Sequence, residues 1–231
     1  MVLCGLEKCG LDRAGESVFQ LPEDFADRLR LGIERWGQTS SRLAAQGWTV
    51  PDSLTPADVY DALEGCVSEE DVDATFVALF EANDGELFEQ ASALLLESRA
   101  VENWHDLLMQ TLDAYKRQHY LLAVPSLLLT IEGVLAVDAG CNTNVKSMAS
   151  ARVAEVQRRL PGSVTLIEWE AAQAVIDKLY QGSPFTGSAP ATLNRHWILH
   201  GRSSATWSQA DCLRLISLLA TLCSLFEPLP V

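Results

Sequence analysis

The chain has 231 residues, of which 48% are apolar and 21% are charged, and its net charge is −14. This composition is ordinary for a folded globular protein and excludes wholesale disorder or a fibrous repeat. Six scattered cysteines, at positions 4, 9, 66, 141, 212 and 223, exclude a dense disulfide framework and are expected to be reduced. The first residues lack the pattern of an export signal, which predicts a cytoplasmic protein.

The excess negative charge lies in the first part of the chain. Residues 1–98 contain 6 Lys+Arg and 20 Asp+Glu, whereas residues 99–231 contain 11 of each, and no basic residue lies between Arg42 and Arg99. Such a surface repels a phosphate backbone. It predicts either a solvated helical face that aids solubility or a docking surface for a basic partner protein. We place a domain boundary near Ser98, between an acidic all-helical region and a second helical bundle.

Every strong periodic pattern is helical, with apolar residues at three- and four-residue spacings. In the first region this pattern predicts a helix from Pro22 to Ala45 and shorter helices over Glu69 to Ala82 and Asp84 to Ser98. Between them, Thr55 is a predicted N-cap and Pro56 the first residue of another helix.

The second region begins with an amphipathic pattern over Val101 to Tyr120. It continues with Leu121 to Val137, which is apolar almost all round. A transmembrane helix needs about 20 such residues. This shorter run also contains Pro125 and Glu132, so we interpret it as the buried central helix of a protein that does not enter a membrane. A carboxylate buried at Glu132 requires an ion-pair or hydrogen-bond partner.

Two amphipathic helices are predicted over Asn144 to Leu160 and Thr165 to Gln181, followed by a loop rich in Gly, Ser and Pro over Gln181 to Pro190. Ser208 and Asp211 have the spacing of a capping box, which predicts the start of the last helix. No long alternating pattern predicts a sheet. The predicted fold class is therefore all-α, a helical bundle.

The segment NRHWILHG, Asn194 to Gly201, precedes that last helix and contains an arginine and two histidines. It predicts a short helix that ends at Gly201 with a left-handed C-cap. His196 and His200 are four residues apart, so their side chains share one face. Three hypotheses compete, namely a metal-binding pair, a structural tie between helices and a catalytic site. No third metal ligand is identifiable, so we predict no bound metal.

Arg195 and His200 also have the spacing of the R-x(4-6)-H motif of the HEPN superfamily, and His196 resembles the polar residue that often follows the arginine. The stretches HYLLAVPSLLLTIEG and LNRHWILHGRSSATWSQADCLRLISLLATL look like the C-terminal region of bacterial HEPN-like proteins. The resemblance covers Trp104 to Phe226 and implies a helical bundle that pairs as a homodimer. Many members are metal-independent RNases of toxin-antitoxin, abortive-infection or other antiviral systems, and some only bind RNA or partner proteins.

By this resemblance, Arg195 would hold the scissile phosphate and stabilise its developing charge, and His200 would transfer a proton. Such cleavage uses the ribose 2′-hydroxyl and would be specific for RNA. Asn194 and His196 would orient the phosphate or partner side chains. Glu132 would fix the guanidinium of Arg195 if the two side chains face each other.

Two functional hypotheses follow. The first is a dimeric, cofactor-independent endoribonuclease that binds RNA and an antitoxin or defence-system partner protein in bacterial defence or growth arrest. The alternative is a non-catalytic helical adaptor or RNA-binding protein whose acidic region, residues 1–98, binds a partner protein. Trp207, the nearest large aromatic residue after the motif, is a candidate either for base stacking or for packing in the core.

Overall fold

The computed structural model describes residues 22, 24–138, 144–182 and 184–226, together with the two-residue strands β1 (Gly10–Leu11) and β2 (Ser17–Val18), which pair antiparallel. The rest of the described regular structure is helical, which confirms the predicted all-α fold class. The helices are α1 (Phe25–Ala44), α2 (Pro56–Ala62), α3 (Glu69–Glu97), the 3-10 helix η1 (Arg99–Trp104), α4 (His105–Lys116), α5 (Tyr120–Asp138), α6 (Val145–Arg159), α7 (Val164–Leu179), α8 (Arg195–Leu199) and α9 (Gln209–Phe226).

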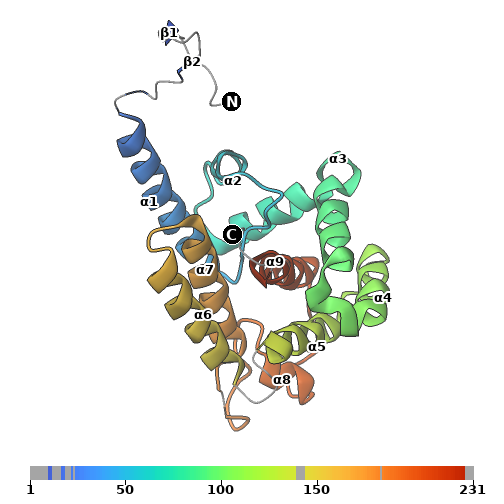
Figure 1. Ribbon diagram of the computed structural model, residues 1–231. Helices are drawn as coiled ribbons and strands as arrows, with labels where there is room; N and C mark the ends of the chain where they lie inside the picture. Colours follow the sequence, from blue (N-terminus) through green and yellow to red (C-terminus); the bar gives the residue numbers. More distant parts are fainter. Residues whose placement is uncertain are drawn as a thin grey trace.

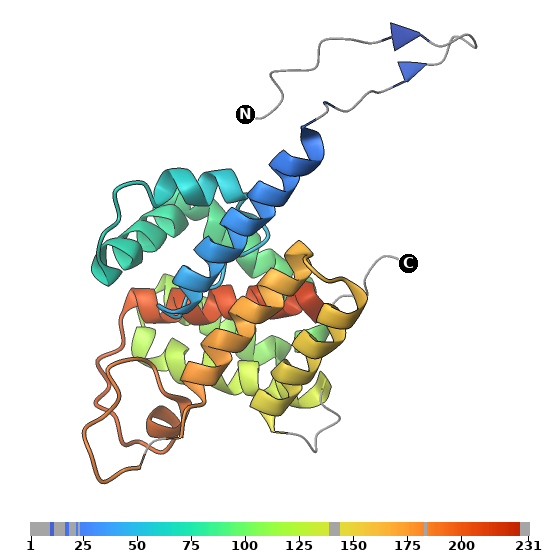
Figure 2. The same ribbon diagram turned by 90° about the vertical axis from the view of Figure 1, so that its left-hand side faces the viewer.

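Helix α9 forms the centre of the bundle. Figure 1 shows it between α3, α5 and α7, and Figure 2 shows α1 and α7 side by side across it. The sequence pattern placed α5 at the centre instead, and that prediction was wrong. On α5, Leu121, Leu122, Leu129 and Val137 have exposed fractions of 48%, 64%, 50% and 50%. The hydropathy of a helix depends on its composition and does not show which of its faces are covered. Helix α5 packs against η1, α4, α6, α8 and α9, yet these four apolar side chains stay exposed.

Both α5 and α9 are long and apolar enough to cross a membrane, judged by length and composition. In the bundle, 44% of the apolar stretch Tyr120–Val137 of α5 is buried. The corresponding share for Gln209–Phe226 of α9 is 67%. The core helix of a globular protein has the same composition as a membrane span of this length. The expectation that the chain does not enter a membrane therefore stays a prediction.

Several helix ends follow the predicted chemistry. Thr55 and Asp58 form a reciprocal capping box at the start of α2, and Ser208 and Asp211 do the same before α9. Within α3, residues 82–85 depart from helical geometry, and three of them in succession have φ of 52°, 58° and 83°. This break lies where the sequence predicted two separate helices, so α3 is two helical segments joined by a kink.

One glycine of α5 is required by close packing. A Cβ atom on Gly133 would lie 2.1 Å from Cζ2 of Trp104 in η1. We expect Gly133→Ala to lower the free energy of unfolding by about 2 kcal/mol, because overpacking costs about 1–3 kcal/mol. Urea unfolding followed by circular dichroism measures the change.

The matched control for that substitution is Gly32→Ala in α1, where nothing lies within 4 Å of the added Cβ. Alanine is favoured over glycine in a helix by about 1 kcal/mol, so this variant should gain stability. A gain of the same size for Gly133→Ala would contradict the close approach of Trp104.

A single hydrophobic core joins the two sides of the predicted boundary near Ser98. Its largest fully buried side chains come from both regions and include Trp48, Phe76, Leu95, Leu128, Ile176 and Leu213. Helix α1 packs on α7, and α3 packs on α9. The acidic region therefore differs from the rest in charge but shares its core.

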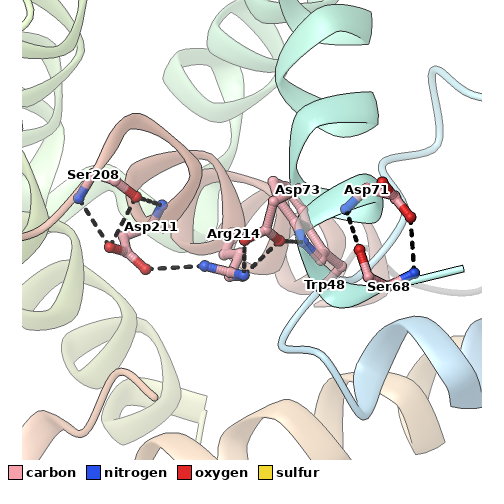
Figure 3. A network of polar contacts seen from close by, with 7 residues as sticks. All are labelled: Trp48, Ser68, Asp71, Asp73, Ser208, Asp211 and Arg214. Atoms are coloured by element: carbon pink, nitrogen blue, oxygen red, sulfur yellow. Dashed lines mark hydrogen bonds and ion pairs between the residues drawn. The ribbon is translucent and has the colours of Figure 1, made fainter. Parts of the chain in front are cut away.

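A polar network also connects α3 with α9. Figure 3 shows Arg214 of α9 between two carboxylates, Asp73 of α3 and Asp211 of α9. Its Nη2 lies 2.5 and 2.6 Å from the oxygens of Asp73, and its Nη1 lies 2.9 Å from Oδ1 of Asp211. The indole N–H of Trp48 donates to Asp73 at 2.9 Å. These three charged side chains are at most 28% exposed, so the network fixes α3 against the start of α9.

Glu168 on α7 is half-buried and has no ion-pair partner in the described part of the chain. Burial, with a smaller contribution from the charge of Asp52, raises the pKa of Glu168 from 4.5 to about 7. Between these two values the folded chain holds a proton that the unfolded chain has released. Stability from this group is therefore present below about pH 4.5 and is lost as the pH rises to about 7.

We expect Glu168→Gln to remove this part of the pH dependence. The variant should be more stable than the unaltered protein by about 2 kcal/mol near pH 8 and nearly equal to it near pH 4.5. Urea unfolding at the two pH values measures the difference. The same loss of stability with rising pH in both proteins would show that Glu168 is not its source.

Candidate functional site

Helix α8 carries the predicted motif and lies among the loops at one end of the bundle (Figure 2). Asn194 caps it, because its Oδ1 accepts the backbone N–H of Trp197 at 3.1 Å. Its Nδ2 donates to the carbonyl of Gln181 at 2.8 Å, which ties the preceding loop to the same point. Gly201 follows the helix with φ of 64°, as the sequence predicted. These two ends confine α8 to Arg195–Leu199.

Arg195 and Glu132 form the ion pair that the burial of Glu132 on α5 required. Nε of Arg195 donates to Oε2 of Glu132 at 2.7 Å, and Nη2 donates to Oε1 at 2.6 Å. This bidentate geometry fixes the plane of the guanidinium. Its Cζ lies 5.9 Å from the ring centroid of Tyr180. Burial, and then the charge of Glu132, raise the pKa of the Tyr180 hydroxyl, so this hydroxyl stays neutral.

The two histidines have a different set of neighbours, which we call the histidine cluster: Phe185, His196, His200 and Arg202. The ring centroids of His196 and His200 are 4.6 Å apart. The ring of Phe185 stacks on His196 at 4.5 Å with an interplanar angle of 7°, and its edge meets His200 at 5.7 Å. Cζ of Arg202 lies 5.2 Å from the centroid of Phe185. Two imidazoles, one aromatic ring and one guanidinium therefore meet at an exposed position.

The predicted site residues thus form two groups. Among the described residues, no hydrogen bond or ring contact joins Arg195 to His200. Asn194 is 3% exposed, and its side chain is engaged in capping α8 and holding the loop. Trp207 is half-buried and packs against the hydrophobic core. The ion pair of Arg195 and the histidine cluster are adjacent because α8 is only 5 residues long.

No family model, curated protein or solved structure matches the chain. The resemblance of the Arg195 and His200 spacing to the HEPN motif therefore stays a prediction.

Three residues of the site were not predicted as members of it. Tyr180 is the C-cap of α7, Phe185 comes from the loop predicted over Gln181 to Pro190, and Arg202 directly follows the left-handed glycine. A loop has no periodic pattern that predicts its neighbours. The available signal was an aromatic residue in a loop otherwise composed of Gln, Gly, Ser, Thr, Ala and Pro, close in sequence to the motif.

In the described chain, no group of three or more His, Cys, Asp and Glu side chains is placed to hold a metal ion. The thiols of Cys66 and Cys212 are not in disulfides, and Cys4, Cys9 and Cys141 lie outside the described residues.

A cavity of about 370 Å³ lies between α1, α3, α7 and α9, away from the histidine cluster. Its lining includes Lys178, Leu193, Asp211 and Arg214 but none of the side chains of α8. The candidate site is therefore an exposed surface at the end of the bundle and not this cavity.

The histidine cluster has the groups needed for proton transfer next to an anion. Imidazoles exchange protons near neutral pH and can act as base or acid. Guanidinium groups donate paired hydrogen bonds to phosphate oxygens. Two imidazoles beside two arginines therefore suit a reaction at a phosphodiester.

Proposed function

We propose that the protein is a metal-independent endoribonuclease of the HEPN type, which acts in bacterial antiviral defence or toxin-antitoxin growth arrest. The observation that carries the proposal is the pair of imidazoles, 4.6 Å apart, at the exposed end of α8. In RNA, the 2′-oxygen attacks the neighbouring phosphorus when a base removes its proton. The 5′-oxygen then leaves with a proton from an acid, which yields a 2′,3′-cyclic phosphate and a 5′-hydroxyl. Two adjacent imidazoles supply one base and one acid.

His200 transfers a proton in this proposal, and His196 is the second imidazole. Arg195 donates to Glu132 through Nε and Nη2, which leaves Nη1 to bind a phosphate oxygen. Glu132 and Asn194 are positioning residues in this proposal. Glu132 holds the guanidinium of Arg195, and Asn194 fixes the start of α8.

A homodimer is part of the proposal. The exposed leucines 121, 122 and 129 and Val137 give α5 an apolar face that a second copy would cover. Glu132 lies on the same helix, so the pairing would bring the two α8 helices toward a common surface.

The test is cleavage of total RNA by the purified chain in EDTA, with the His200→Ala variant beside it. EDTA-resistant cleavage that the variant loses would support the proposal. Cleavage that the variant retains would point to a contaminating nuclease.

The adaptor hypothesis is favoured by one observation. Of the described carboxylates in the segment 52–97, Asp73 and Glu89 pair with Arg214 and Lys116, and the others have no Lys or Arg partner in the described chain. An acidic surface without counterions suits a basic protein. A defined partner that binds the His200→Ala variant normally, and binds less well when exposed α3 glutamates are changed to glutamine, would favour the adaptor.

A further inference from the structure

Phe185 has no part in the hydrophobic core. The core cluster and the side chains packed against it do not include Phe185, whose ring is 38% exposed. Its ring contacts are with His196, Trp197 and His200, all from α8 and its C-terminal end. A large apolar ring on the surface beside two imidazoles therefore calls for an explanation other than core packing.

Exposed aromatic rings beside cationic groups are the stacking platforms of proteins that bind single-stranded nucleic acid. The other aromatic side chains at this end of the bundle are less suited. Trp197 is 5% exposed, and Tyr180 and Trp207 pack against the core. One face of Phe185 rests on His196 at 4.5 Å, which holds the ring in place. The exposed guanidinium of Arg202 lies over the same ring, with its Cζ 5.2 Å from the ring centroid, and can stack on a base or donate to a phosphate.

We propose that Phe185 and Arg202 form the platform for one unpaired nucleobase next to His200, so that the ligand is single-stranded nucleic acid. The role of this base in cleavage rests on the function proposed above, whereas the stacking itself does not. In a duplex the faces of all but the terminal bases are covered by their neighbours, so a duplex offers the platform only its two ends. Stacking tolerates every base, so little sequence preference is expected.

The competing explanation is that Phe185 only covers Trp197, whose ring centroid is 5.5 Å away. Phe185→Leu separates the two explanations, because leucine keeps an apolar cover and lacks a flat aromatic face. Phe185→Trp is the rescue variant, since indole stacks on bases at least as well as phenyl. Phe25→Leu in α1 is the matched control, because Phe25 is also exposed, at 41%, and lies outside the site.

The experiment measures binding of three fluorescein-labelled probes by anisotropy, at low salt and in EDTA. The probes are a thymidine dodecamer, an abasic dodecamer of the same charge and a duplex dodecamer. DNA is used because it lacks the 2′-hydroxyl that the proposed cleavage needs. Stacking of one base corresponds to a fivefold change in Kd or more, so we expect the thymidine probe to bind at least about fivefold more tightly than the abasic probe.

In Phe185→Leu this ratio is expected to fall to about one, and in Phe185→Trp and Phe25→Leu it should stay at the level of the unaltered protein. An unchanged ratio in Phe185→Leu would show that the base does not stack on Phe185 and would overturn the proposal. A ratio near one in the unaltered protein, equal binding of the duplex, or no binding of any probe would also overturn it. A ratio that depends on Phe185, found together with no RNA cleavage, would support the platform and reject the endoribonuclease.

Discussion

The His200→Ala variant is expected to cleave RNA at least about 100-fold more slowly than the unaltered protein. A positioned acid or base contributes about 10² to 10⁴ to the rate, and alanine cannot transfer a proton. His200 follows the last residue of α8, is exposed, and contacts His196 and Phe185 only through its ring edges and faces. Its loss should therefore leave the free energy of unfolding within about 0.5 kcal/mol of the original. Initial rates on a labelled RNA and urea unfolding measure the two effects.

The control for this substitution is His119→Ala, because His119 is exposed and lies before α5, outside the site. This variant should keep full activity. Loss of folding in His200→Ala would instead assign the motif a structural role. Arg195→Ala is a less direct test, since it also leaves the half-buried carboxylate of Glu132 without its counterion.

The Arg214→Met variant is expected to lose about 3 kcal/mol of stability. Removing one partner of a buried ion pair costs about 3–5 kcal/mol, because the remaining charge stays desolvated. Here two carboxylates, those of Asp73 and Asp211, would lose their common counterion. Their remaining exposure of 28% and 20% places the expected loss at the lower end of that range. Methionine keeps most of the side-chain volume, so the loss of stability measures the removal of the positive charge.

Arg28→Met in α1 is the matched control. Arg28 also donates two hydrogen bonds to one carboxylate, Asp24, at 2.7 and 2.8 Å. Both of these side chains are more than half exposed, and exposed ion pairs contribute little. We expect a loss below about 0.5 kcal/mol. A similar loss in the two variants would show that burial does not set the strength of the Arg214 network.

Local sequence patterns predicted the helices well, because caps and turns depend on residues close together in the chain. The Thr55 capping box, the break in α3 at residues 82–85 and the start of α9 after Ser208 are examples. The relative burial of α5 and α9 could not be predicted in the same way. Both are apolar, and their positions depend on contacts between helices far apart in sequence.

The candidate site was predictable only in part, for the same physical reason. The ion pair of Glu132 and Arg195 follows from the cost of burying a charge, and the Asn194 cap and Gly201 turn are local. The stacking of Phe185 on His196 depends on the path of an irregular loop. The path of this loop cannot be predicted from the cost of burying a charge or from the spacing of apolar residues.

The central position of α9 has a consequence for the order of folding. Helices α3, α5 and α7 precede α9 in the chain, so their apolar faces are synthesised before the helix that covers them. The pairing of α3 with α9 also closes a loop of more than 100 residues, and contacts of such long range slow folding. A nascent chain that has not yet reached Gln209 therefore presents an open apolar groove, which favours aggregation or capture by a chaperone until α9 is inserted.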